Sequence, residues 1–171
     1  MSVFELIKAY FAYSSWATAR LFDALEQLTA EQYDERGASG HGSIRDNLAH
    51  LMAVQLRWFS WFDGSLTATL AQQLNVTRES IDTVAKARER WLSIDAQATE
   101  YVNGLNDDKL RDIWTWTLPT GKSDSLPLWR LLMHVANHGT HTRAQIIAAV
   151  RRAGHAPPNV DFLNYSLMNR G

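Results

Sequence analysis

The sequence predicts an all-α protein, a four-helix bundle with a short hairpin or loop insertion before its last helix. Long stretches of the 171-residue chain repeat apolar residues at helical steps of three and four. Shorter stretches rich in glycine, proline, asparagine and aspartate separate them. Apolar residues make up 46% and charged residues 20% of the chain, which is typical of a folded globular protein. The length suits one domain, expected to span residues 1–171.

The first helix is expected from about Val3 to Leu28. Ile7, Phe11 and Leu21 recur within it at helical spacing, which predicts one apolar face against a core. A loop that contains three glycines follows and separates this helix from the next.

The two middle helices are marked by local signals. Ser43, with Asp46 three residues later, resembles a capping box, so a helix is expected to begin at Ser43 and to end before Asp63. A third helix is expected from roughly Thr77 to Tyr101, where apolar residues again recur at steps of three and four. The other face of this third helix is highly charged, which indicates a solvated surface.

Residues 106–126 break the helical pattern. Tryptophan and threonine alternate from Trp114, and Pro119 with the glycine two residues later is a turn signal, so a short hairpin is expected here. The last helix is expected from Pro127 to Ala153, because proline favours a first helical turn and a glycine follows as a stop signal. The tail beyond it is apolar enough to pack back on the body.

Composition argues against several classes of protein. Seventeen basic and eighteen acidic residues give a net charge of −1, which argues against a nucleic-acid-binding protein. The absence of cysteine excludes disulfides, thiolate zinc sites and cysteine nucleophiles. No charge-free apolar run reaches the roughly 18 residues of a membrane span, and no signal peptide pattern is present at the start. The expected localisation is the cytoplasm.

Histidines carry the strongest chemical signal. Three of the six, His134, His138 and His141, lie close together in the last expected helix. At about 100° per residue, the other two lie within about 60° of His138, so the three imidazoles share one narrow strip. This strip is expected to face the core, and Arg143 is expected to lie off it.

A metal site is the chemistry that this spacing favours. Imidazoles three or four residues apart reach one ion when another helix completes the coordination, and His50, beside the apolar stripe of the second helix, is the candidate. His134 and His141 are about 10.5 Å apart along the helix axis, so only one of them is expected to join His50 and His138. Three imidazoles with open positions suit catalysis more than structure. The alternative is that these are hydrogen-bonded core histidines, the commoner role of a single histidine on an apolar face.

Other side chains have two interpretations as well. His41 and His155 lie in expected loops and are interpreted as ordinary loop residues. Trp16, Trp58 and Trp61 lie on helices expected near the metal. They either line a substrate pocket or, as most tryptophans at helical spacing do, fill the core.

Several motifs in a fixed order resemble those of a known family. They are Tyr13-Ser14-Ser15-Trp16-Ala17, then Leu48-Ala49-His50-Leu51, then the stretch from His134 to Gln145, and Gly154, Pro157 and Asp161 in the tail. In that order and at those distances they resemble the DinB family (DinB/YfiT-like) of damage-inducible bundle proteins. The resemblance covers nearly the whole chain, and the histidine stretch of the last helix is its most specific part.

The resemblance implies a four-helix bundle of down-up-up-down topology that holds a divalent metal ion, most often zinc or nickel. In the family one ligand comes from the second helix and two come from an H-x-x-x-H-R-G-Q-like stretch of the last helix. His50 and His138 match the first two ligands. The third ligand position falls on Thr142, and Ala144 stands where the family usually has glycine.

This departure leaves three outcomes open. His141 substitutes as the third ligand, or the coordination slides one turn along the helix to His134, or the site holds metal weakly or not at all.

The function that the resemblance implies is a metal-dependent, thiol-dependent S-transferase acting on small electrophiles. A metal ion lowers the pKa of a bound thiol, and because the chain has no cysteine the thiol comes from a low-molecular-weight cofactor. The expected partners are this thiol, a small-molecule electrophile and a second copy of the chain in a homodimer, with no nucleic acid and no membrane. The alternative is a non-catalytic, stress-associated binding or dimerisation bundle whose metal site is structural or vestigial.

Overall fold

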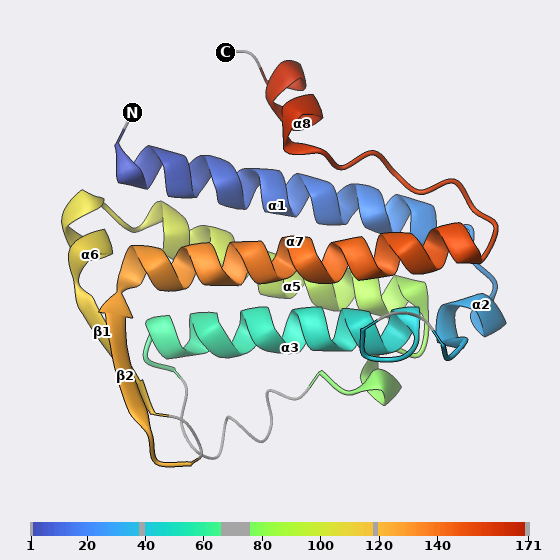
Figure 1. Ribbon diagram of the computed structural model, residues 1–171, viewed down its shortest axis with the longest axis horizontal. Coiled ribbons are helices and arrows are strands. Elements are labelled where there is room, and N and C mark those ends of the chain that lie inside the picture. Colours follow the sequence, from blue (N-terminus) through green and yellow to red (C-terminus); the bar gives the residue numbers. More distant parts are fainter. Residues whose placement is uncertain (1, 38–39, 66–75, 118–119, 170–171) are drawn as a thin grey trace.

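The computed structural model describes residues 2–37, 40–65, 76–117 and 120–169 and shows a mostly helical chain with one small two-stranded sheet (Figure 1). Four long helices lie side by side: α1 (Val3–Leu25), α3 (Ile44–Phe62), α5 (Val84–Asn103) and α7 (Leu128–Arg152). The shorter elements are α2 (Ala30–Asp34), the 3-10 helix η1 (Arg78–Ile81), α6 (Asp107–Arg111), β1 (Ile113–Thr117), β2 (Ser123–Pro127) and α8 (Phe162–Met168).

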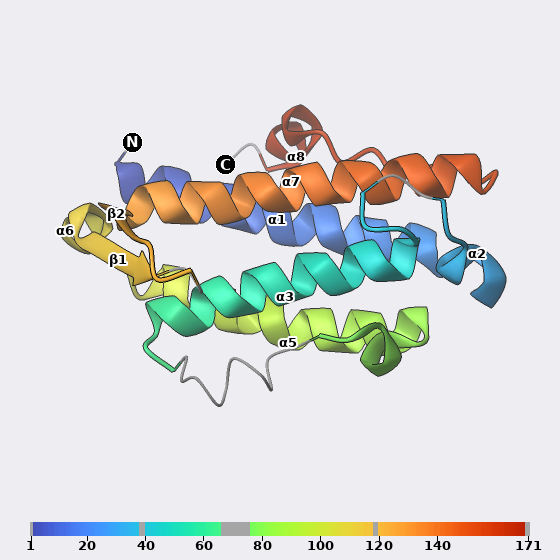
Figure 2. The same cartoon turned by 60° about the horizontal axis from the view of Figure 1, so that its bottom comes forward.

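Each long helix packs against two others. α7 lies against α1 and α3, and α5 lies against the same two helices, as the turned view in Figure 2 also shows. The helices α3 and α7, which carry the candidate histidines, are therefore direct neighbours although they are far apart in the sequence.

The core consists of two apolar clusters along the helices. One cluster includes Leu21 of α1 and Trp91 of α5, and the other includes Phe11 of α1 and Val102 of α5. Buried polar side chains lie between the two clusters, including Ser14 and Thr18 of α1 and Thr142 and Arg143 of α7. Burying these groups requires that their polar atoms find partners.

Arg143 is the centre of this polar layer. Its side chain is 1% exposed, and Nη1 donates to Ser14 Oγ at 2.8 Å and to Thr18 Oγ1 at 3.2 Å. Nη2 donates to Thr140 Oγ1 at 3.1 Å. The prediction that Arg143 lies off the core face is wrong, because α1 packs on that side of α7 and turns it into interior. The arginine thereby joins the last helix to the first.

A half-buried carboxyl group lies next to this layer. Asp95 of α5 accepts a hydrogen bond of 3.0 Å from Ser15 of α1. Partial burial raises the pKa of the Asp95 carboxyl, while the Ser15 hydroxyl and the Arg143 guanidinium oppose that rise. The carboxylate and the buried guanidinium therefore favour each other's charged forms.

The helix boundaries confirm the capping signals and correct two of the expected ends. α3 begins after Ser43, whose capping box with Asp46 is formed. α1 ends at Leu25 rather than at residue 28, because Thr29 starts a second capped helix, α2. α5 begins at Val84 rather than at residue 77, because Thr83 provides the cap and η1 precedes it.

The hairpin before the last helix is confirmed. β1 and β2 pair antiparallel, with Trp114 opposite Leu126 and Trp116 opposite Asp124. The prediction of an all-α protein is wrong, because the chain contains this small sheet. Pro119, which was expected in the turn of the hairpin, lies outside the described residues.

The tail packs back on the body as expected, since Tyr13 donates to the carbonyl of Val160 at 2.9 Å. In the part of the chain that is described, no helix has the length and apolar character needed to cross a membrane.

Replacing Arg143 tests the polar layer. Arg143→Ala is expected to lower the free energy of unfolding by about 3 kcal/mol, because it empties buried space and leaves the hydroxyls of Ser14 and Thr18 without their donor. Urea unfolding measures the loss. Arg151→Ala, an exposed arginine on the same helix, is the matched control and is expected to change stability by less than about 0.5 kcal/mol. Equal effects of the two variants would contradict the assigned role.

Candidate functional site

Two imidazoles meet where α3 and α7 pack. Nε2 of His50 lies 2.9 Å from Nε2 of His138, and the ring centroids are 4.9 Å apart. Both side chains are half-buried, so solvent reaches part of each ring. His50 follows directly from the apolar stripe of α3, where its neighbour Leu51 is 1% exposed. The structure therefore brings together these two of the predicted ligands.

The environment keeps both rings neutral at pH 7. Burial lowers the pKa of His138 to about 4, and the neighbouring imidazoles of His50, His134, His141 and His41 lower it further. Burial also lowers the pKa of His50, together with the charges of His41 and Arg57. Neutral imidazole is the form that coordinates metals. With two facing nitrogens, the pair either shares one proton in a hydrogen bond or directs two lone pairs at one ion.

His41 also belongs to this site, which the sequence prediction missed. Its ring stacks on that of His50, with centroids 3.6 Å apart and planes at 25°. The backbone N–H of His41 donates to Asn47 Oδ1 at 3.3 Å, which ties the loop to α3. Gly40 and Gly42 flank it with φ values of 83° and 121°, a region that favours glycine. A Gly-His-Gly sequence just before a capped helix is the signal that would have found it.

The other helix-α7 histidines point elsewhere. His141 is exposed, and its Nε2 lies 3.0 Å from Nε2 of Gln145. His134 is exposed too, and its ring lies 5.5 Å from Trp58 and 6.4 Å from His138, centroid to centroid. The close approach to His50 is therefore made by His138.

Thr142, at the third ligand position implied by the family resemblance, is 1% exposed and lies in the interior. Within the described ranges, no group of three or more histidine, cysteine, aspartate or glutamate side chains is placed to hold a metal ion. The described residues thus supply two converging imidazoles.

The spacing of the pair fits a shared metal ion. Imidazole nitrogens bind zinc at about 2.0–2.1 Å, so two such ligands on one ion lie about 2.9 Å apart at a right angle and about 3.4 Å apart at the tetrahedral angle. The observed 2.9 Å between His50 and His138 falls at the lower end of this range. The remaining positions of such an ion would be open.

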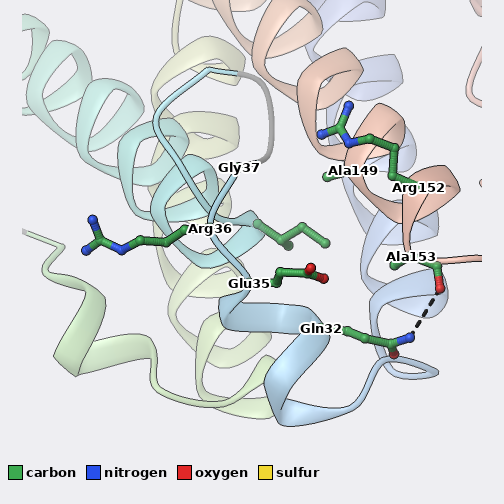
Figure 3. Close-up of a pocket in the computed structure, with 8 residues that line it drawn as sticks. Gln32, Glu35, Arg36, Gly37, Ala149, Arg152 and Ala153 are labelled. Carbon is green, nitrogen blue, oxygen red and sulfur yellow. Dashed lines mark hydrogen bonds between the residues drawn. The ribbon is translucent and has the colours of Figure 1, made fainter.

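In the described part of the chain several hollows lie near the ends of these helices, and two of them bear on the question of a ligand pocket. One, of about 190 Å³, is lined by residues of α2 and its following loop and by the end of α7 (Figure 3). Gln32 spans its edge by donating to the carbonyl of Ala153 at 3.1 Å, and Arg36 extends away from the other lining side chains. No histidine lines this hollow, so it does not extend the imidazole pair.

The second hollow, of about 360 Å³, is aromatic. Trp58 and Trp61 line it, together with side chains of the hairpin. Trp16 does not; its ring lies against Tyr13 and Tyr165, at 6.2 Å and 5.4 Å between centroids. This second hollow borders the histidines through the contact of Trp58 with His134.

The chain is similar to known proteins over nearly its whole length. A family model described as DinB family matches residues 1–170. Protein DinB of Bacillus subtilis (strain 168) is 28% identical over 169 residues, which cover 94% of this chain and 93% of that protein.

The pH dependence of stability tests the neutral state of His138. The unfolded chain binds a proton at this ring below about pH 6.5, whereas the folded chain does so only near pH 4. The free energy of unfolding of metal-free protein is therefore expected to fall as the pH drops from 6.5 to 4. In His138→Gln this fall is expected to be shallower by urea unfolding, with His155→Gln as the control. Parallel pH curves for wild type and His138→Gln would count against the shift.

Proposed function

The chain belongs to the DinB family, and we propose that His50 and His138 hold a divalent transition metal ion, zinc or nickel, in a metal-dependent thiol S-transferase. We also propose that the four long helices form the down-up-up-down four-helix bundle that the resemblance implies. The observation that carries the proposal is the approach of two neutral imidazole nitrogens to 2.9 Å from separate helices.

The chemistry follows from what the metal and the chain each supply. A bound metal ion acts as a Lewis acid that lowers the pKa of a thiol and so makes a nucleophile at neutral pH. The chain contains no cysteine, so the sulfur comes from a low-molecular-weight thiol. In the proposed reaction a sulfur–carbon bond forms on the electrophile, and the leaving group departs with the proton that the thiol loses.

The residues around the pair serve this chemistry by position. His50 and His138 are kept unprotonated by burial, so they remain ligands at neutral pH. The stacked ring of His41 covers one side of His50 and restricts its rotation. Both rings are only half-buried, so an ion held between them could be reached from solvent.

A second candidate function has its own supporting observation. Thr142 lies in the interior at the family's third ligand position, and the described residues place two rather than three ligating groups together. With two ligating groups the metal ion would be bound more weakly than by three. This supports the alternative, a non-catalytic bundle with a vestigial or structural metal site.

Metal titration of single variants separates these proposals. We expect His50→Ala and His138→Ala each to weaken zinc or nickel binding by at least about tenfold, because each removes half of the imidazole pair. His141→Ala and His134→Ala are the matched controls on the same helix and are expected to retain affinity within about threefold. Isothermal titration of tag-free protein measures all four. Equal losses of metal affinity in these controls would show that the metal site lies elsewhere along α7.

A gain-of-function variant gives the reverse test. Thr142→His restores a ring at the position of the family's third ligand and is expected to tighten metal binding, with its folding checked by urea unfolding because the position is buried. No tightening in a folded Thr142→His protein would argue that this position does not face the ion.

Activity is tested with glutathione and monobromobimane, whose fluorescence rises when its carbon–bromine bond is replaced by a carbon–sulfur bond. The metal-loaded protein is expected to accelerate the reaction above metal alone, and His138→Ala is expected to abolish the acceleration. If the loaded protein binds metal, gains thermal stability and accelerates no thiol transfer across a panel of thiols and electrophiles, the structural alternative is favoured.

A further inference from the structure

The aromatic hollow between α3, the hairpin and α7 is built as a ligand pocket. We call it the indole pocket, and its lining is Trp58, Trp61, Phe62, Trp114, Thr115, Trp116, Thr117 and Leu131. Its volume of about 360 Å³ lies within the range of small-molecule sites, roughly 300–1,000 Å³. α3 supplies its tryptophans from its last turns, and β1 supplies two more from the opposite wall.

Trp58 links the two walls of the indole pocket. Its ring centroid lies 5.3 Å from that of Trp61, with planes at 81°, and 6.2 Å from that of Trp116, with planes at 64°. These are edge-to-face arrangements, which orient neighbouring indoles at steep angles and fix their positions. All three rings are half-buried, so each keeps part of its surface toward the hollow.

The lining carries no formal charge at any of its residues. The hydroxyls of Thr115 and Thr117 are already engaged, at 2.8 Å each, with those of Ser125 and Ser123 across the hairpin. A charged ligand would lose its hydration here without an opposite charge in the lining to compensate. The chemistry of this wall therefore selects an uncharged, flat, aromatic molecule.

A chain of ring contacts links the indole pocket to the imidazole pair. Trp58 contacts His134 at 5.5 Å between centroids, His134 lies 6.4 Å from His138, and His138 faces His50. A row of ring contacts thus runs from the hairpin through Trp58 and the histidines of α7 to His50 and the loop of His41.

We propose that the indole pocket binds the uncharged aromatic body of a small molecule and holds its reactive end toward His50 and His138. The assignment of this molecule as the electrophile rests on the proposed function. Binding itself depends on the tryptophans and not on a metal ion, so it is measured on metal-free protein.

The experiment uses the indole N–H signals of the seven tryptophans in the nitrogen–proton NMR spectrum, assigned with Trp→Phe variants. The probe is 1-naphthylmethanol. Its titration is expected to shift the signals of Trp58, Trp61 and Trp116 and to leave those of Trp16 and Trp91 in place. Shifts of similar size at all tryptophans, or no shift, would overturn the proposal.

Charge selectivity is tested with two molecules on the same ring system. Because the lining is uncharged, 1-naphthoate and 1-naphthylmethylammonium are expected to bind at least about tenfold more weakly than the alcohol. Tighter binding of the ammonium would overturn the assignment to uncharged ligands and identify a cation–π site.

Variants locate the binding. Trp58→Ala is expected to weaken 1-naphthylmethanol binding about fivefold or more, as is Trp116→Ala on the opposite wall, so the test does not depend on one substitution. Trp16→Ala, which removes a half-buried tryptophan outside the pocket, is expected to bind as wild type does. Unchanged affinity in both pocket variants, each with urea unfolding like that of wild type, would overturn the proposal.

Failure of this inference is distinguishable from failure of the proposed function. His50→Ala is expected to bind 1-naphthylmethanol with unchanged affinity, since it leaves the indole pocket intact. A protein that binds the alcohol but no metal refutes the metal proposal and supports the pocket. A protein that binds metal but shows no alcohol-dependent shifts refutes the pocket alone.

Discussion

The packing of α3 along α7 is the contact on which the candidate chemistry depends. It joins residues 88 positions apart in the sequence and sets the 2.9 Å between the two Nε2 atoms. Neither helix alone provides a chelating pair of this kind, since the histidines of α7 other than His138 face solvent. The buried faces that drive this packing lie directly beside the two histidines, with Leu51 next to His50 and Gly139 next to His138 both buried. The geometry of the pair is therefore set by the hydrophobic core and by no local motif.

Burial has opposite electrical consequences in two neighbouring parts of α7. At His138 burial lowers the pKa, so the imidazole loses its proton and is neutral, the form with the lower free energy in a buried site. At Arg143 the guanidinium has no such option at physiological pH, so the fold surrounds it with three hydroxyl acceptors and a nearby carboxyl. Two of these hydroxyls, of Ser14 and Thr18, come from α1, and the third, of Thr140, comes from α7 itself. The buried cation of the last helix therefore depends on acceptors from the first helix as well as from its own.

The sequence predicted those features that are encoded locally. The cap at Ser43, the hairpin around Trp114 and the apolar stripe of each long helix are each legible within a few residues, and the structure has them. The pairing of His50 with His138 was predictable from helical spacing together with the family resemblance. The prediction for Arg143 was wrong because helical spacing gives the angle of each side chain but not which sides of α7 face other helices. Two helices, α1 and α3, pack against α7, and this buries more of its circumference than one neighbour would.

His41 shows the complementary limit. Its position depends on a loop whose path is set by two glycines with positive φ and by the side chain of Asn47, and no periodicity encodes such a path. At Gly40 a side chain would collide with Asn47 and Gln145, so the loop approaches both α3 and α7 as closely as glycine permits. That close approach places the His41 ring on His50. On the other side of the pair, His134 and Trp58 continue the ring contacts from His138 toward the hairpin. Burial among these neighbours lowers the pKa of both His50 and His138, and the neutral imidazole that results is the form able to bind a metal ion rather than a proton.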